Sequence, residues 1–195
     1  GDINNISWLK KPEKKWGPYE KMRQVAEVCA SAVHKAHQDV EFRDYVTLAA
    51  AKEEVTLAIR KPTEEQLAYA KTILAKPEDA KPYHRHEKTY ANRVQSVNGW
   101  PDEIPAVLQT FRIGDWGVCS MPFEVFAEIG LQMKAESPLQ STFVVSHANG
   151  SYGYLPTAEQ HKLGGYETWL GTNNVEFEAA SKIVDRLLAM FESVK

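Results

Sequence analysis

A β-hairpin is predicted near the middle of the chain, where residues 106–121 read AVLQTFRIGDWGVCSM. Gly114 and Asp115 divide this stretch into two largely apolar runs, residues 106–113 and 116–121. A glycine-containing two-residue connection between such runs is a strong local signal for a tight turn. The two runs are therefore expected to pair as neighbouring antiparallel strands of one sheet.

Strands and helices are expected to alternate on both sides of this hairpin. Two short upstream strands are predicted at residues 46–51 and 55–59, separated by the charged Lys52-Glu-Glu54. Downstream, the continuous apolar run 142–146 predicts a strand buried on both faces. Apolar periodicity and end signals predict helices at residues 19–37, 63–75, 85–97 and 123–135, and a last helix capped by Asn174. The alternation predicts an α/β fold with a mixed sheet and flanking helices.

The composition is that of an ordinary globular chain. Of the 195 residues, 43% are hydrophobic and 25% are charged, which suffices for one α/β domain with its own core. A net charge of −3 indicates no basic surface for nucleic acid, and no apolar run approaches the roughly 20 residues of a transmembrane helix. Cys29 and Cys119 are expected to be buried free thiols rather than a disulfide, because both lie among apolar residues.

Polar residues follow two of the predicted strands at their carboxyl ends. Glu124 comes shortly after the second strand of the hairpin, and Asn149, Tyr152 and Tyr154 follow the strand at residues 142–146. Ligands of open α/β sheets gather beyond the carboxyl ends of strands, so Glu124 and the two tyrosines converge if the two strands are neighbours. A carboxylate and a phenolate are hard oxygen donors that suit a divalent metal ion. The alternative is that Glu124 only stabilises the N-terminus of the following helix through the helix dipole.

From about Phe111 to its end, the chain resembles the C-terminal part of the catalytic domain of the neutral/alkaline non-lysosomal ceramidase family. The resembling residues are Phe111-Arg-Ile-Gly-Asp-Trp-Gly-Val-Cys-Ser-Met-Pro-Phe-Glu-Val-Phe126, Phe143-Val-Val-Ser-His-Ala-Asn-Gly150, Gly153-Tyr-Leu-Pro-Thr-Ala-Glu-Gln160 and Gly165-Tyr-Glu167. Family members carry an acid after the strand, an asparagine-bearing turn with a tyrosine, and a Tyr-Glu pair further on. The interval of twelve residues from Tyr154 to Tyr166 matches that pattern. The resemblance implies the C-terminal portion of a larger ceramidase-like catalytic domain.

The resemblance also implies roles for individual residues. In the family, the acid and the first tyrosine bind zinc and the second tyrosine helps to hold the reacting carbonyl. This implies Glu124 and Tyr154 as zinc ligands and Tyr166 as a contact for the carbonyl or oxyanion. The family's two histidine ligands lie upstream of anything present here. Its catalytic serine is in a Gly-Asp-Val-Ser segment that the opening Gly1-Asp-Ile-Asn4 resembles, so Asn4 takes the place of the serine.

The histidines of this chain allow a limited prediction. His34 and His37 fall on a polar helix face, and His84 and His86 fall in a charged stretch, so all four are expected to be solvated. His147 precedes the turn at Asn149, where it either lines the pocket or packs at the end of its strand.

The resemblance implies a zinc-dependent hydrolase of N-acyl (amide) bonds in a small molecule or lipid, with residues 1–195 as one α/β domain of a longer chain. The piece alone is expected to be inactive as a ceramidase, because the upstream histidines are absent. The alternative is a non-catalytic ligand-binding protein with the same fold. Asn4 favours that alternative, because asparagine is not a nucleophile. A secreted or periplasmic location is implied by the family alone.

Overall fold

The computed structural model describes residues 14–195, which divide into two compact units, residues 14–46 and residues 47–195. The smaller unit contains helix α1 (Glu20–Gln38), close to the helix predicted at residues 19–37. None of the residues of α1 is buried. Cys29 on this helix is therefore exposed, which contradicts our expectation, whereas Cys119 is buried as expected, and both are free thiols.

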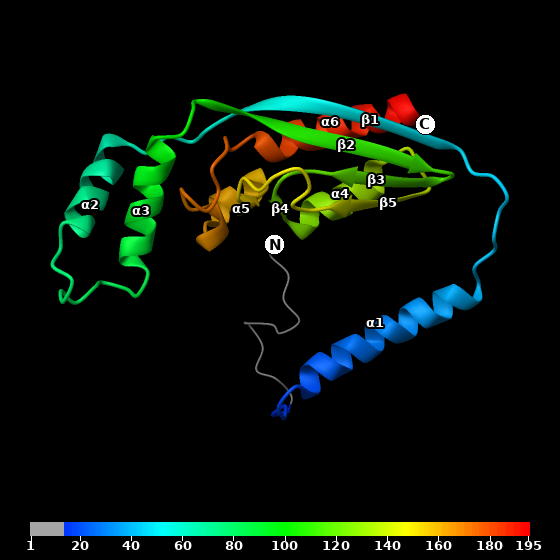
Figure 1. The fold of residues 1–195 in the computed structure, drawn as a ribbon, viewed down its shortest axis with the longest axis horizontal. Coiled ribbons are helices and arrows are strands. Elements are labelled where there is room, and N and C mark those ends of the chain that lie inside the picture. Colours follow the sequence, from blue (N-terminus) through cyan, green and yellow to red (C-terminus); the bar gives the residue numbers. More distant parts are fainter. Residues whose placement is uncertain (1–13) are drawn as a thin grey trace. The chain divides into compact units, whose positions relative to one another are not determined.

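A four-stranded sheet in the order β1-β2-β3-β5 forms the centre of the larger unit (Figure 1). Its strands are β1 (Leu48–Ala58), β2 (Glu103–Ile113), β3 (Trp116–Ser120) and β5 (Ser141–Val145). Strands β1 and β3 are antiparallel to β2, while β5 is parallel to β3, so the mixed sheet and the α/β class are confirmed. The hairpin of β2 and β3 is also confirmed, with a left-handed φ of 60° at Gly114.

The two strands predicted at residues 46–51 and 55–59 are one continuous strand, β1, so this prediction was wrong. The charged residues 52–54 pair with residues 107–109 of β2. Burial alternates along β1, so one face packs on the core and the other is solvated, and charged side chains are tolerated. Glu53, on the packed face, forms an ion pair with Arg186.

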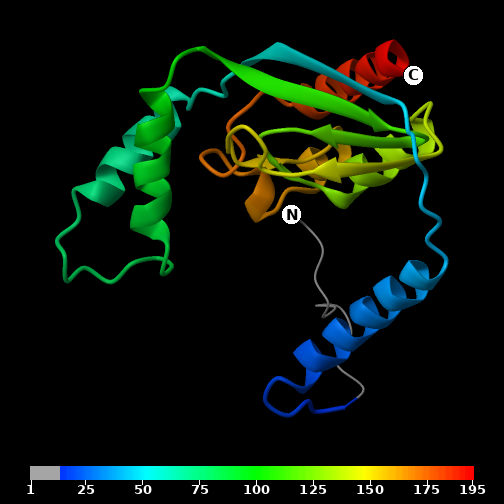
Figure 2. The ribbon, with the colours of Figure 1, turned by 45° about the vertical axis from the view of Figure 1, so that its right-hand side comes forward.

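A helical hairpin of α2 (Glu64–Leu74) and α3 (Glu87–Asn98) connects β1 to β2 and extends beyond the end of the sheet (Figures 1 and 2). A capping box begins α2: Gln66 N donates to Thr63 Oγ1 at 3.2 Å, and Thr63 N donates to Gln66 Oε1 at 2.9 Å. Ala70, Ile73 and Ala91 form a small core between the two helices. The helical hairpin is thus held together by packing of its own.

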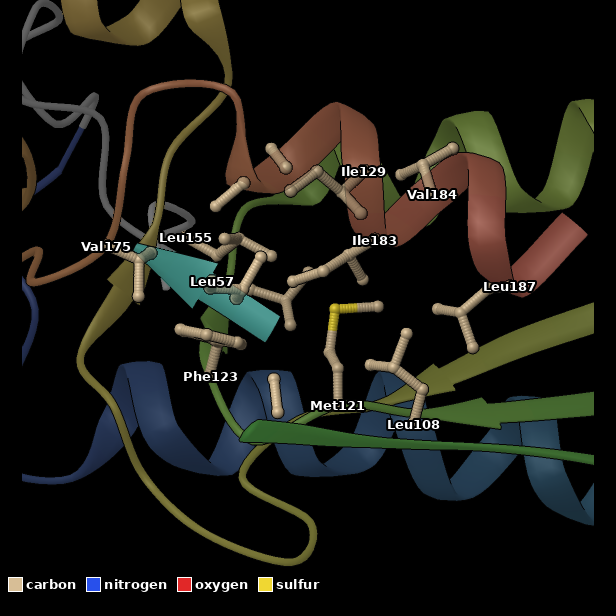
Figure 3. Packing of buried hydrophobic residues seen from close by; sticks show 14 of the residues in the cluster. Leu57, Leu108, Met121, Phe123, Ile129, Leu155, Val175, Ile183, Val184 and Leu187 are labelled. Carbon is tan, nitrogen blue, oxygen red and sulfur yellow. The ribbon is translucent and has the colours of Figure 1, made fainter. Parts of the chain in front are cut away.

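Helices α4 (Ala127–Glu136) and α6 (Ala179–Val194) pack against each other and against the sheet, and the main core lies between them and the strands (Figure 3). Leu57 and Leu108 of the strands and Ile183 and Leu187 of α6 are fully buried there. Burying one such side chain contributes about 1.5–3 kcal/mol. The apolar residues of α6 recur on one helix face, which is why this helix lies against the sheet.

The opposite face of the sheet keeps large apolar side chains exposed, including Trp116 and Phe143. Strand β5 lies at the edge of the sheet and alternates between exposed and buried residues. The prediction that residues 142–146 are buried on both faces was therefore wrong. Continuous apolar composition does not distinguish a strand covered on both faces from one with an open apolar face.

A second, two-stranded parallel sheet is formed by β4 (Glu124–Val125) and β6 (Tyr154–Leu155). Helix α5 (Ala158–Leu163) and a short 3-10 helix, η1 (Tyr166–Thr168), follow β6 in the chain. This small sheet lies beyond the carboxyl ends of β3 and β5 in the sequence, so it carries the residues predicted to converge there.

Two helix boundaries differ from the prediction. Helix α4 begins at Ala127, so Glu124 lies in a strand before the helix rather than in its first turn. Helix α6 begins at Ala179, so Asn174 does not cap it; its Nδ2 instead donates to Tyr152 O at 3.1 Å. Of the helices within residues 14–195, none is long and apolar enough to cross a membrane.

Candidate metal and substrate site

The pairing of β4 with β6 places Glu124 beside Tyr154. The two strands are parallel and in register at these residues, and Glu124 N donates to Gly153 O at 2.9 Å. The Tyr154 hydroxyl donates a hydrogen bond to the Glu124 carboxylate. The structure thus brings together the two residues that the resemblance implies as zinc ligands. Their binding of zinc stays a prediction.

The loop at residues 146–153 is bonded directly to the connection between β3 and β4. His147 N donates to Phe123 O at 3.0 Å, and Tyr152 N donates to Pro122 O at 2.9 Å. His147 and Asn149 adopt left-handed φ angles of 54° and 64°, which are uncommon for residues other than glycine. Strained backbone of this kind is concentrated at functional sites, so the loop is a candidate for function.

Gly153 is needed where the chain enters β6. Its φ is 90°, and a Cβ atom at this position would lie 2.2 Å from Thr172 O. Thr172 O in turn accepts a hydrogen bond from Tyr154 N at 3.0 Å. Because residue 153 lacks a side chain, the backbone at Thr172 can lie against β6 and fix Tyr154 from a second side.

Asn173 supports Tyr154 from the same segment and was missed by the sequence analysis. It is fully buried, its Nδ2 donates to Tyr154 O at 3.0 Å, and its Oδ1 accepts from Arg60 Nη1 at 2.6 Å. Its partner Arg60 lies far away in the sequence. The single available signal was the polar run Thr172-Asn-Asn174 ahead of an apolar helix.

Tyr154 lies between an apolar ring and a polar partner. Its ring is 6.4 Å from that of Phe126 and 5.6 Å from that of Tyr166, both edge-to-face. Burial raises the pKa of Tyr154 above its usual value, and the hydrogen-bonded Glu124 carboxylate raises it further. The phenol is therefore protonated at neutral pH in the protein alone, and a bound divalent cation would act in the opposite direction.

His147 lies next to Glu124, with 3.9 Å between His147 Nε2 and Glu124 Oε2. Their side chains are 47% and 35% exposed. His147 therefore lies beside one of the two implied zinc ligands, and the choice between its two alternatives stays a prediction. The other four histidines considered above are exposed, as expected, and two of them, His84 and His86, contact the ring of Tyr90.

Tyr166 lies beside the pair, and the Asn149 side chain is bonded to the sheet. The Tyr166 ring is 5.6 Å from that of Tyr154 and remains 40% exposed. Asn149 Nδ2 donates to Gln109 Oε1 of β2 at 2.7 Å, which ties the loop to the sheet. Asn4 lies outside the described residues, so its role stays a prediction.

The donors at this edge fit part of a zinc site. Zinc in proteins takes four ligands, with nitrogen, sulfur or carboxylate oxygen as donors. Glu124 carries a carboxylate, Tyr154 carries a phenol that as a phenolate is a further oxygen donor, and the His147 imidazole of the loop lies near the carboxylate. Within residues 14–195, no three histidine, cysteine, aspartate or glutamate side chains gather around one point. A zinc site at this edge would need donors besides these, and the binding of zinc stays a prediction.

The fold is that of an α/β protein with polar side chains gathered beyond the carboxyl ends of β3 and β5. Models of protein families give no match to the chain, and neither do curated proteins. Among solved structures, the chain is similar to the neutral ceramidase from Pseudomonas aeruginosa, with a TM-score of 0.55 and 14% identity, over 93% of this chain and 34% of that chain. It is also similar to a ceramidase complexed with C2, with a TM-score of 0.57 and 12% identity, over 89% of this chain and 34% of that chain.

The chain thus spans about a third of the length of the ceramidases that it matches, since 34% of each is covered. At identities of 14% and 12% this likeness shows the fold alone. The chain has an α/β fold similar to part of a neutral ceramidase, which confirms the predicted fold class. The zinc ligands, the catalytic residues and the substrate stay predictions.

Proposed function

We propose that this chain carries part of a zinc-dependent hydrolase site that cleaves N-acyl (amide) bonds, in the manner of a ceramidase. The observation that carries the proposal is the in-register pair of Glu124 and Tyr154, with hydrogen-bonded side chains and Tyr166 alongside. Similarity to part of the ceramidase fold supports it. On this proposal the chain is the C-terminal portion of a larger catalytic domain, and two histidine ligands come from upstream.

Each residue then has a defined task. Glu124 and Tyr154 hold the metal ion, and the neighbouring His147 orients the Glu124 carboxylate, as outer-shell partners of metal ligands do. When bound, zinc polarises a carbonyl and lowers the pKa of a bound water toward about 7. The Tyr166 hydroxyl donates to the carbonyl oxygen as negative charge develops on it. The Asn4 amide orients the substrate or the attacking water.

The site residues are poorly explained by stability alone. Glu124 and His147 are partly exposed, and even a fully charged pair with such exposure contributes only about 0–1 kcal/mol. The loop beside them nevertheless keeps two non-glycine residues, His147 and Asn149, in the left-handed region. A costly backbone that positions weakly stabilising side chains is expected where those side chains have a function.

The test is hydrolysis of an N-acylsphingosine by the full-length protein. Turnover is expected to stop on chelation and to return with zinc. Glu124→Gln is expected to remove zinc-dependent turnover, and Tyr166→Phe to lower kcat by about 10²–10³, as loss of one oxyanion donor does. Glu159→Gln is the matched control, because Glu159 is exposed and pairs with Lys162 on α5. Turnover that survives chelation, or that is equal in Glu124→Gln and Glu159→Gln, would contradict the proposal.

A second candidate is a non-catalytic ligand-binding protein with the same fold, and Asn4 in place of a serine favours it. This candidate predicts binding of an N-acyl ligand without release of the fatty acid, whether or not zinc is present. Zinc-dependent release of the acid would exclude it.

A further inference from the structure

A row of aromatic rings runs from the candidate metal site to helix α3. From Tyr154 the ring centroids follow at 5.6 Å to Tyr166, 6.3 Å to Trp169 and 5.1 Å to Tyr90. Each step is edge-to-face, a geometry that aromatic pairs prefer. The row therefore connects the polar edge at β6 with the helical hairpin of α2 and α3.

Two of these rings keep a large part of their surface in solvent. Trp169 is 47% exposed and Tyr166 is 40% exposed. Large aromatic side chains are highly buried on average, and an open aromatic surface beside a polar site is typical of ligand binding. Packing within the described chain leaves this surface unused.

A cavity of about 170 Å³ lies between α2 and α3, where Tyr90 is one of the lining residues. Most of its lining is apolar or aromatic, and Gln66 and His84 also contribute to it. Glu87 also lines it, but its carboxylate is engaged by Lys76 Nζ at 2.9 Å. The aromatic row thus ends at a mainly apolar cavity whose buried charge is already paired.

The row of aromatic rings is held in place by contacts between α3 and the loop that follows η1. Arg93 Nη1 donates to Thr172 Oγ1 at 3.1 Å. Gly171 has a φ of 83°, and a Cβ atom there would lie 2.6 Å from Arg93 Cβ, so the loop and α3 are in close contact. A subsite built on such contacts needs little ordering when a ligand binds.

We infer that Tyr166, Trp169 and Tyr90 form a subsite for the alkyl chain of an N-acyl substrate, leading from the Glu124–Tyr154 pair toward the cavity between α2 and α3. A long uncharged chain matches successive half-exposed rings followed by an apolar cavity. Arg93 is the nearby cation with which a negatively charged ligand group would pair. Its guanidinium already lies 5.4 Å from the Tyr90 ring centroid and donates to Thr172, so these contacts favour an uncharged ligand chain. The identity of the chain as an acyl group rests on the proposed function.

The test is calorimetric titration of the 195-residue protein with N-dodecanoylglycine, below its micellar concentration, and with N-acetylglycine. The two probes share the amide and the carboxylate and differ in the alkyl chain. We expect the long probe to bind at least tenfold more tightly. Trp169→Ala is expected to weaken its binding about tenfold, and Trp169→Phe to restore much of it. Trp116→Ala is the matched control, because Trp116 is 58% exposed on the open face of the sheet.

Equal binding of the two probes, or unchanged binding of the long probe to folded Trp169→Ala, would overturn the subsite. Tyr90→Phe and Tyr90→Ala form a second pair at the other end of the row, and loss of affinity in the alanine variant alone is expected. The titration is repeated with Glu124→Gln, in which the chain-length preference should persist. Absence of zinc-dependent hydrolysis in the wild-type full-length protein, with this preference intact, contradicts the proposed function and supports the subsite. Hydrolysis that is indifferent to chain length overturns the subsite alone.

Discussion

The packed face of the four-stranded sheet and the edge formed by β4 and β6 are built in different ways. On the packed face, Leu57, Leu108 and Ile183 are fully buried, and removal of apolar surface from water accounts for their positions. At the edge, Glu124 and His147 are partly exposed, and a loop with two left-handed non-glycine residues positions them. Burial explains the residues of the packed face, whereas burial explains little of the sequence at the edge.

The largest effect is expected on the packed face, from Phe191→Ala. Phe191 of α6 is fully buried, and truncation of a buried phenylalanine costs about 3–5 kcal/mol in the free energy of unfolding. Urea denaturation measures the loss. Leu163→Ala on α5 is the control, because Leu163 is 78% exposed, and its effect is expected to stay within about 0.5 kcal/mol. Similar losses in both variants would contradict the assignment of the core.

A smaller loss is expected at the edge, from Gly153→Ala. The added Cβ meets Thr172 O in a residue that already has a φ of 90°, so we expect a cost above the roughly 1 kcal/mol of a left-handed alanine. Gly164→Ala separates the strain of a positive φ from the steric contact of the added Cβ. Gly164 has a φ of 76°, but no atom lies within 4 Å of its added Cβ. Thermal unfolding of both variants gives the comparison. A Gly153→Ala variant no less stable than Gly164→Ala would show that the contact with Thr172 is unimportant.

The smallest effect concerns pH and the helical hairpin. The hydrogen bond from Lys76 lowers the pKa of Glu87 below its usual value, and His84 acts in the same direction. The folded pKa is lower than the unfolded one, so this stabilisation is complete above the unfolded pKa and is lost as pH falls through the folded one. The unfolding free energy of Glu87→Gln should therefore depend less on pH below about 4.3, the usual pKa of glutamate, than that of the wild type. The exposed Glu78→Gln variant should retain the wild-type profile.

Local signals account for what the sequence predicted correctly. The hairpin at Gly114 and the capping box at Thr63 depend on residues that are close together in the chain, and both are confirmed. The proximity of Glu124 and Tyr154 was expected if the strands before them were neighbours, because residues that follow the carboxyl ends of neighbouring parallel strands lie at the same edge of the sheet. The structure shows them paired across β4 and β6.

Distant partners account for what was missed. Asn174 was predicted to cap the last helix, but its side-chain amide instead donates a hydrogen bond to Tyr152 O. Asn173 depends on Arg60, and the surroundings of Trp169 depend on Tyr90 of the helical hairpin. Hydrophobic patterns and secondary-structure propensities carry no information about such distant contacts. The hydrogen bonds that hold Tyr154 and the row of aromatic rings could therefore not be predicted from the sequence.

The most direct test of the central claim, that Glu124 and Tyr154 bind zinc, is elemental analysis of the purified full-length protein and its variants. The account predicts about one zinc ion per wild-type chain, as expected for a site with four ligands. It predicts loss of that zinc in Glu124→Gln and Tyr154→Phe, and its retention in Glu159→Gln. Zinc retained unchanged in folded Glu124→Gln would contradict the account.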